Sequence, residues 1–184
     1  LQLTTRNGQK QGSSAMESGA VDPNRIFTAT ASHPVRERFR PYSTKRVSGL
    51  SFATAASVGG SLRWRIVQGN RELASGRISS GANYYGLQLK SARVGKVYWY
   101  DASFGAITLQ AGQTYDVEFQ PEGGSQWKFA DFRNGSHHGF SSPVAFTESN
   151  AQHRVNGNWI NAYHFNHYSN GGTDSNWPVV LHLD

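Results

Sequence analysis

Apolar and polar residues alternate along several short stretches of this chain, and the clearest stretch covers residues 106–120. On both sides of an Ala-Gly-Gln turn the apolar residues share one face: Ile107, Leu109, Tyr115, Val117 and Phe119. A period of two is that of a β-strand buried on one side only. The stretch therefore predicts an antiparallel hairpin with one dry and one wet face, the unit from which sandwiches and barrels are built.

Further strands are predicted wherever the same alternation is bounded by turn residues. They cover residues 25–30, 35–42, 47–53, 61–68, 71–79, 83–89, 96–104, 126–132, 145–147, 159–168 and 179–183. Gly69-Asn70 predicts a tight hairpin between two of them, and Asn134-Gly135, Asn156-Gly157 and Asn170-Gly171 predict turns. Alternation places Val35, Glu37 and Phe39 on one face of residues 35–42 and Leu62, Trp64 and Ile66 on one face of residues 61–68, with the arginines of both stretches on the other face. Short strands at a spacing of roughly 8–12 residues are typical of an all-β sandwich or barrel.

The chain divides into a polar start and one domain. Residues 1–24 show no sustained period and predict a linker or loosely attached arm, whose first residues, 1–5, are able to pair as an edge strand. Residues 25–184 predict a single β-sandwich domain, since 184 residues suit one core. With Leu1 first and no apolar leader, the chain is interpreted as a mature or excised part of a soluble protein.

Composition narrows the chemistry. The chain has no cysteine, which excludes disulfides and thiolate sites. Its formal charge of +6 favours an anionic partner, although a modest positive charge also serves solubility alone.

Three segments together resemble a known class of modules. These are Val47-Ser-Gly-Leu-Ser-Phe52, then Ser61-Leu-Arg-Trp-Arg-Ile-Val-Gln-Gly-Asn70 with Leu73-Ala-Ser-Gly-Arg77, and Ile107-Thr-Leu-Gln-Ala-Gly-Gln-Thr-Tyr115. They are similar to the jelly-roll carbohydrate-binding modules of secreted polysaccharide-degrading enzymes, over roughly residues 26–183. The shared residues are mostly core and turn positions, so the resemblance indicates no particular family or sugar.

The resemblance implies a fold, a function and a location. The expected fold is a jelly-roll β-sandwich of two antiparallel sheets. The expected function is non-catalytic, lectin-like binding of an acidic, uronate-bearing polysaccharide by a monomeric module that targets an attached enzyme. The implied location is extracellular or periplasmic, with neither nucleic acid nor membrane as partner.

Aromatic side chains beside polar ones are the candidate binding residues, because sugar C–H groups stack on aromatic rings. Residues 97–101 carry aromatics on both faces of one strand, so at least one should be exposed, and Trp99 with Asp101 is the preferred exposed pair. The alternative is that all these aromatics are core or edge residues. The densest mixture of aromatic, amide and imidazole groups adds Trp159, Tyr163, His167 and Trp177, for which two strands with satisfied polar neighbours are the plainer interpretation.

Arginines form a second candidate set. Arg63 and Arg65 alternate along one strand, and they are expected to join a basic stripe with Arg36, Arg38, Arg40, Lys45 and Arg46. Guanidinium groups bind uronate carboxylates or sulfates in a bidentate manner. Alternating arginines also protect solvated strands from pairing with other chains.

No cofactor is required by the sequence. The histidines at 137, 138, 153, 164 and 167 lack the spacing of a zinc site. A structural calcium ion is an open alternative, with Asp22, Asp101, Asp131 and Asp174 as possible oxygen donors and no assigned ligand set.

Two rival functions remain. Arg71-Glu72-Leu73, Gln152-His153 and Tyr163–Tyr168 look like fragments of alginate-lyase signatures, which makes a β-sandwich polysaccharide lyase the alternative. Gln152 and His153 are adjacent, however, whereas the signature separates them by one residue. Single-stranded nucleic acid is a weaker rival, because the Asn and Gly richness fits glycan better.

Overall fold

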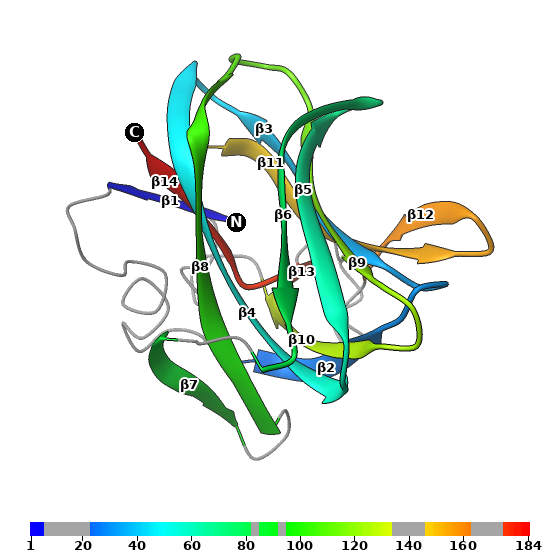
Figure 1. Cartoon of the computed structure of the whole chain (residues 1–184). Helices are drawn as coiled ribbons and strands as arrows, with labels where there is room; N and C mark the ends of the chain where they lie inside the picture. Colours follow the sequence, from blue (N-terminus) through cyan, green and yellow to red (C-terminus); the bar gives the residue numbers. More distant parts are fainter. Residues whose placement is uncertain (6–22, 82–84, 92–94, 134–145, 163–174) are drawn as a thin grey trace.

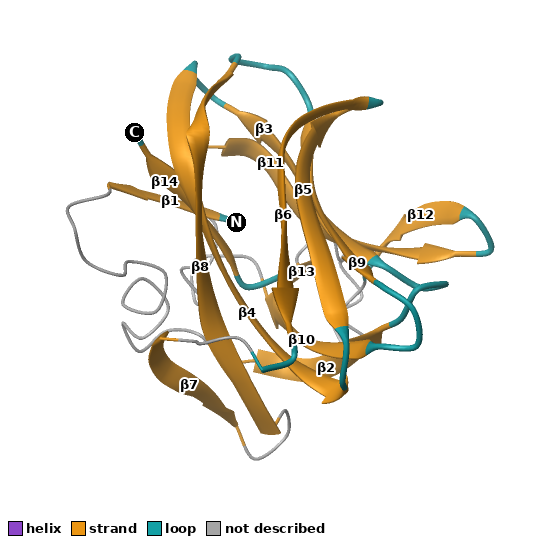
Figure 2. Ribbon diagram, viewed as in Figure 1, coloured by secondary structure: helices purple, strands orange, loops and turns teal. Residues whose placement is uncertain are grey.

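The computed structural model describes residues 1–5, 23–81, 85–91, 95–133, 146–162 and 175–184, and the elements within these ranges are β-strands (Figures 1 and 2). In chain order they are β1 (Gln2–Thr5), β2 (Pro23–Ala29), β3 (Val35–Pro41), β4 (Lys45–Val58), β5 (Ser61–Gln68), β6 (Arg71–Ser79), β7 (Tyr85–Ser91), β8 (Gly95–Leu109), β9 (Tyr115–Pro121), β10 (Gln126–Arg133), β11 (Phe146–Val155), β12 (Asn158–Asn161), β13 (Ser175–Asn176) and β14 (Val179–Leu183). In the ranges described, no helix has the length and apolar character to cross a membrane.

The strands form two sheets. One has six strands in the order β12-β11-β3-β9-β5-β6. The other has eight: β1-β14-β4-β10-β13 form its main path, β2 pairs with β10, and β8 lies between β4 and β7. Strand pairing is antiparallel except between β1 and β14. The predicted all-β fold with two antiparallel sheets is therefore confirmed.

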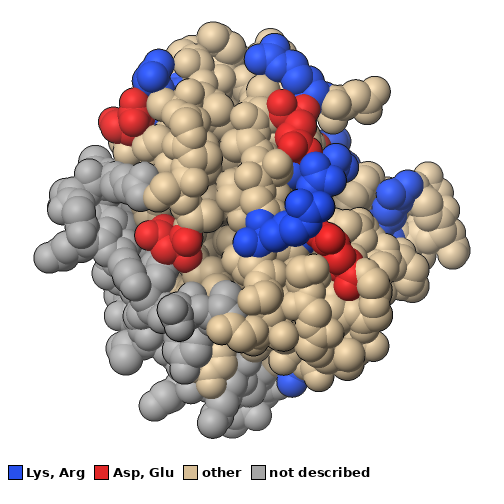
Figure 3. All heavy atoms as spheres, in the orientation of Figure 1, with Lys and Arg blue, Asp and Glu red and all other residues tan. Residues whose placement is uncertain are grey.

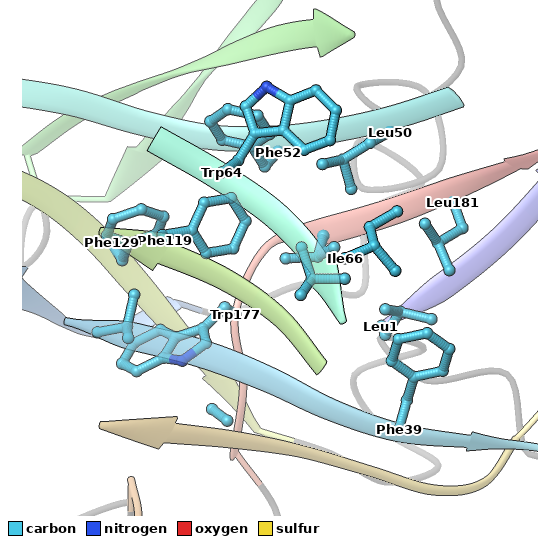
Figure 4. Close-up of a cluster of buried hydrophobic side chains, with 14 of the residues drawn as sticks. Leu1, Phe39, Leu50, Phe52, Trp64, Ile66, Phe119, Phe129, Trp177 and Leu181 are labelled. Atoms are coloured by element: carbon cyan, nitrogen blue, oxygen red, sulfur yellow. The ribbon is translucent and has the colours of Figure 1, made fainter. Parts of the chain in front are cut away.

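The main core lies between the sheets. Phe119 of β9 meets Phe52 of β4 with 4.8 Å between ring centroids, and it meets Phe129 of β10 at 5.0 Å. Trp177, Trp64 and Leu1 extend the same cluster, which Figure 4 shows in close-up. Side chains of both sheets thus share one apolar interior, as alternation predicts for two sheets that each bury one face.

The predicted hairpin at residues 106–120 is wrong in one respect. Its two strands exist and face the core as expected, but β8 and β9 do not pair with each other. β8 pairs with β4 and β7, and β9 pairs with β3 and β5. The Ala-Gly-Gln segment therefore carries the chain from one sheet to the other, because a short turn can join strands of facing sheets as well as neighbours in one sheet.

Backbone and side-chain hydrogen bonds hold this crossing in place. The N–H of Gly112, at a φ of 72°, donates to the carbonyl of Pro41 at 2.9 Å. The N–H of Ala111 donates to Thr44 Oγ1 at 3.2 Å, and the N–H of Gln110 donates to the Tyr115 hydroxyl at 2.8 Å. Since Pro41 and Thr44 flank the link from β3 to β4, the two crossings between the sheets lie against each other.

One predicted hairpin and one predicted turn are confirmed. Gly69-Asn70 joins β5 to β6, with Gln68 opposite Arg71 and Gly69 at a φ of 59°. The sequence also favoured turns at Asn-Gly pairs, and Asn156-Gly157 joins β11 to β12. β11 extends to Val155, well beyond the three residues predicted for it, because its alternation of small and polar residues lacked strong apolar positions.

The start of the chain belongs to the fold. The edge strand expected at residues 1–5 is present as β1. The α-ammonium of Leu1 lies in the interior and donates to Glu37 Oε1 at 3.1 Å and to Asn176 Oδ1 at 2.9 Å. Burial lowers the pKa of that ammonium, and the Glu37 carboxylate opposes the shift. Glu37, on the core face of β3 as predicted, also accepts the N–H of Trp177 at 2.8 Å.

Candidate functional site

The outer face of the six-stranded sheet, called the polar face below, carries most of the predicted arginines. Alternation in β3 turns Val35, Glu37 and Phe39 inward and the intervening arginines outward. The same period places Asp116 and Glu118 outward on β9, and Arg63 and Arg65 outward on β5. Cross-strand register puts Arg36 and Arg65 opposite Glu118, and Arg38 opposite Asp116.

These opposed charges form short ion pairs. Arg38 donates to both carboxylate oxygens of Asp116, at 2.9 and 3.0 Å. Arg65 reaches Glu118 at 2.6 Å, and Arg63 reaches Glu72 of β6 at 2.7 Å. Figure 3 shows the blue and red atoms lying next to one another over this part of the molecule. Arg63 and Arg65 thus lie together as predicted, but a carboxylate accompanies each.

The predicted basic stripe therefore needs correction. Lys45 and Arg46 lie on β4, in the other sheet, where Lys45 Nζ donates to Ser43 Oγ and Arg46 pairs with Asp184 at 2.8 Å. The stripe is in fact a lattice of paired charges on the polar face. The positions of the arginines in the sequence do not show which strands become neighbours or which acidic residues lie between them. The sequence alone therefore did not predict this pairing.

An aromatic and amide cluster lies at the β11–β12 end of the polar face. The Arg36 guanidinium lies over the Trp159 ring, 4.3 Å from its centroid. Arg36 Nε donates to Gln152 Oε1 at 2.7 Å, and Gln152 Nε2 donates to Asn161 Oδ1 at 2.9 Å. These two hydrogen bonds hold the guanidinium that stacks on Trp159, which is half-buried.

Arg36 itself is largely enclosed. Arg36 is 8% exposed, and this burial lowers the pKa of its guanidinium below the ordinary value. The Asp116 carboxylate, 3.4 Å away, opposes the shift. The side chain stays charged, because an arginine titrates far above neutral pH. Arg36 thus positions Trp159 by a cation–π contact rather than presenting a free cation.

The turn after β11 orients one further arginine. Asn156 and Gly157 have φ values of 49° and 81°, the left-handed pair of a tight hairpin turn. The Gly157 carbonyl accepts from Arg154 Nε at 3.3 Å. Arg154 is exposed and lies directly opposite Trp159 in the strand register. Sequence reasoning missed Arg154, although alternation from Asn150 and the Asn-Gly turn were enough to place it beside Trp159.

Two of the predicted ring platforms are buried. Trp99 and Trp177 each have no exposed surface, so neither offers a ring face to a ligand, and the expectation that Trp99 is exposed is wrong. Trp99 belongs to a second apolar cluster with Ala53, Val97, Ala130 and Val180, while its neighbour Tyr100 is in the main core. The rings on both faces of β8 are buried here, which agrees with the alternative that these aromatics are core residues. Trp177 instead donates its indole N–H to the Gln152 carbonyl at 3.1 Å.

Of the other predicted binding residues, Asp101 is described by the structure and Tyr163 and His167 are not. Asp101 is exposed as predicted, and it accepts a hydrogen bond from Ser51 Oγ at 3.0 Å. Tyr163 and His167 lie outside the described residues, as do His137, His138, His164, Asp22 and Asp174. Across the ranges that the structure describes, no group of three or more His, Cys, Asp or Glu residues is arranged to hold a metal ion.

A second polar cluster lies on the eight-stranded sheet. His182 Nε2 is 2.6 Å from Ser51 Oγ, which also contacts Asp101, and Gly49 leaves room for the imidazole because a Cβ there would lie 3.1 Å from it. The Asp101 carboxylate is 3.6 Å from the same Nε2. A catalytic triad needs the acid on the other ring nitrogen, so this cluster does not have the order nucleophile, base, orienting acid.

Among the fragments that look like a lyase signature, Gln152 and His153 point to opposite faces of their sheet. Gln152 faces Arg36 on the polar face, whereas His153 faces inward and contacts the Phe27 ring with 4.9 Å between centroids. Adjacent strand residues point to opposite faces, so the two side chains do not share a groove.

Comparisons of this chain with protein-family models, curated proteins and solved structures found no match. The fold and the polar face define the molecule as an all-β protein of two packed antiparallel sheets.

Proposed function

We propose that this protein is a non-catalytic module that binds an acidic polysaccharide on the polar face of its six-stranded sheet. The observation that carries the proposal is the juxtaposition of Trp159 with Arg36, Gln152 and Asn161. A fixed, half-buried indole supplies a surface for sugar C–H groups, and amides beside it suit hydroxyl groups.

The surrounding charge supports an acidic ligand. Among the side chains of this face that the structure describes, the arginines outnumber the carboxylates: Arg36, Arg38, Arg40, Arg63, Arg65, Arg77 and Arg154 accompany Glu72, Asp116, Glu118 and Glu122. An excess of guanidinium groups attracts polyanions and raises their association rate. The proposal also includes a jelly-roll order of strand connections, a secreted location and attachment to a larger enzyme. The resemblance of the core and turn residues to carbohydrate-binding modules supports these three points.

Affinity electrophoresis tests the proposal. Native gels containing polygalacturonate, alginate or a neutral polysaccharide are run at low and at physiological salt, with Trp159→Ala and Tyr42→Ala beside the unaltered protein. Tyr42 is 68% exposed but lies in the β3–β4 link, which makes it the matched control.

We expect retention by the acidic polymers, a loss of about tenfold or more in affinity for Trp159→Ala, and no change for Tyr42→Ala. Absence of retention by every polymer at both salt concentrations overturns the proposal. Following the ultraviolet absorbance of unsaturated uronate during incubation with alginate separates binder from lyase, and a steady rise contradicts the non-catalytic assignment.

A further inference from the structure

Arg154 differs from the arginines of the ion-pair lattice. Arg38, Arg63 and Arg65 each contact a carboxylate, whereas the described part of the chain places none against Arg154. Figure 3 shows a separate blue patch over the β11–β12 hairpin, apart from the mixed charges over β5 and β6. An exposed guanidinium with no carboxylate against it among the described residues is available to attract an anion from solution.

The hairpin turn determines which edge of Arg154 faces outward. Because Nε is engaged by the Gly157 carbonyl at 3.3 Å, the two terminal nitrogens remain as a planar fork. Such a fork matches the two oxygens of a carboxylate. The left-handed φ values of Asn156 and Gly157 place that carbonyl, so the turn sequence itself orients the guanidinium.

Trp159 lies directly opposite Arg154 in the strand register and is the one accessible indole of the protein. The sequence holds five tryptophans. Trp64, Trp99, Trp127 and Trp177 are 0–3% exposed, and only Trp159 is half-buried. Side chains directly opposite on paired strands are about 5 Å apart at Cβ, which is close to the width of one sugar ring.

We propose that Arg154 and Trp159 together form the carboxylate-reading subsite for one uronic-acid unit, whose ring stacks on the indole while its carboxylate meets the Arg154 fork. Arg36, held by Gln152 and Asp116 under the same indole, is the positioning residue. This inference rests on the proposed function and adds to it the subsite and the ligand group that is recognised.

The test compares one polymer with and without its carboxylates. Isothermal titration calorimetry measures binding of oligogalacturonate and of the same oligomer after reduction of its carboxylates to primary alcohols. The variants are Arg154→Gln, Arg154→Lys and the control Arg71→Gln. Arg71 is also exposed and also lies next to a hairpin turn, but no aromatic residue is opposite it, since its register partner is Gln68.

The unaltered protein is expected to bind the carboxylated oligomer about tenfold or more tightly than the reduced one, a ratio typical of a charge-assisted bidentate contact. Arg154→Gln should reduce this ratio to about twofold or less, Arg154→Lys should give an intermediate ratio, and Arg71→Gln should preserve it. Thermal unfolding of each variant checks that the fold is intact. Equal losses in Arg154→Gln and Arg71→Gln, or no loss in Arg154→Gln, would overturn the inference.

Tryptophan fluorescence supplies an independent measurement. Oligogalacturonate should protect the protein from quenching by acrylamide, and Trp159→Phe should remove both the quenchable fraction and its protection, because the other indoles are buried. Unchanged protection in Trp159→Phe contradicts the subsite. A sulfated dextran arm distinguishes the anion, and tighter binding of the sulfated polymer than of oligogalacturonate overturns the carboxylate assignment.

The two proposals fail in different ways. If the unaltered protein binds neither the carboxylated nor the reduced oligomer, nor any other polysaccharide, the proposed function is wrong. If it binds them and Arg154→Gln behaves as Arg71→Gln does, only the subsite is wrong.

Discussion

Trp99 and Tyr100 are neighbours in β8 whose side chains point to opposite faces of one sheet, and both are buried. A strand with two apolar faces must be covered twice, by the facing sheet on one side and by a second apolar cluster on the other. Trp159, in contrast, stays partly exposed. Its strand β12 lies at the edge of the six-stranded sheet, and the Arg36 guanidinium lies over its ring. The same residue type thus serves as core or as candidate platform according to what its strand packs against.

Gly76 shows how a single residue adapts to such packing. A Cβ at Gly76 would lie 2.6 Å from the Trp64 ring, which is 3% exposed and covers the neighbouring strand. Gly76→Ala should lower the free energy of unfolding by about 1–3 kcal/mol, because the indole has to shift out of its packed position. Urea denaturation followed by fluorescence measures this change.

Gly105→Ala is the matched control. Gly105 also lies in a strand, β8, and a Cβ there meets no atom within 4 Å. Its effect should stay within about 0.5 kcal/mol. Equal destabilisation by the two variants would show that loss of glycine itself, rather than the Trp64 contact, is responsible.

At the scale of elements, the hairpin of β5 and β6 and the crossing between β8 and β9 show how similar turns lead to different pairings. Gly69-Asn70 joins strands that become hydrogen-bonded neighbours, whereas Ala111-Gly112-Gln113 joins strands of different sheets. The hairpin also brings Glu72 and Ser75 of β6 next to the arginines of β5, and these neighbours change the pKa of the Glu72 carboxyl.

The Glu72 carboxyl provides a test of that hairpin. Hydrogen bonding from Ser75 lowers its pKa below the ordinary 4.5, and the charges of Arg63 and Arg65 lower it further. A depressed pKa favours the charged form in the folded state. Its contribution to stability is therefore present above the ordinary pKa and is lost as the pH falls through the folded-state pKa.

Ser75→Ala should raise the Glu72 pKa toward its ordinary value, because the Ser75 hydrogen bond is the largest single cause of the shift. Titration of the Glu72 carboxyl carbon by NMR between about pH 2 and 7, a range that spans the transition, measures this change. An unchanged pKa in Ser75→Ala beside a raised pKa in Arg63→Gln would show that charge, rather than the hydroxyl, lowers the Glu72 pKa.

At the scale of the whole molecule, the polar face is one connected network. Hydrogen bonds and ion pairs run from Gln152 on β11 through Arg36 on β3 to Asp116 on β9, and the Glu118 carboxylate of β9 continues them to Arg65 on β5. The network links strands that are far apart in the sequence, so it forms only when the complete sheet has assembled. It also holds the Trp159 cluster at one end of the sheet.

Asp116 is the centre of this network, with a residue exposure of 3% and contacts to both Arg36 and Arg38. Asp116→Asn should lower the free energy of unfolding by about 3 kcal/mol, because the enclosed Arg36 and the partly exposed Arg38 lose the carboxylate that they share. Chemical denaturation measures the loss, and Glu122→Gln serves as the control. Glu122 pairs with Arg77, which is 61% exposed, so less than about 1 kcal/mol is expected there. Similar losses in both variants would show that burial of the network contributes nothing.

Alternation and turn residues predicted most of the strands, and for β3 and β5 they also predicted which side chains face the core. They also indicated Trp159, Arg63 and Arg65 as residues on an outer surface. They did not predict that Arg154 accompanies Trp159, that Gln152 and Asn161 support it, or that Trp99 and Trp177 are buried. Those features depend on which strands become neighbours, and β11, β3, β9 and β5 come from distant parts of the chain.

By itself, then, the sequence determined most of the residues that form strands, which way the side chains of β3, β5 and β9 point and where the turns at Gly69 and Gly157 lie, because side-chain alternation and left-handed turn preferences are local properties of the backbone. Only the tertiary structure decided that β8 and β9 belong to different sheets, that Asp116 and Glu118 neutralise the arginines of the polar face, and that Trp159 rather than Trp99 stays accessible. The physical reason is that strand pairing and burial are set by the packing of two whole sheets against each other, which no short segment specifies.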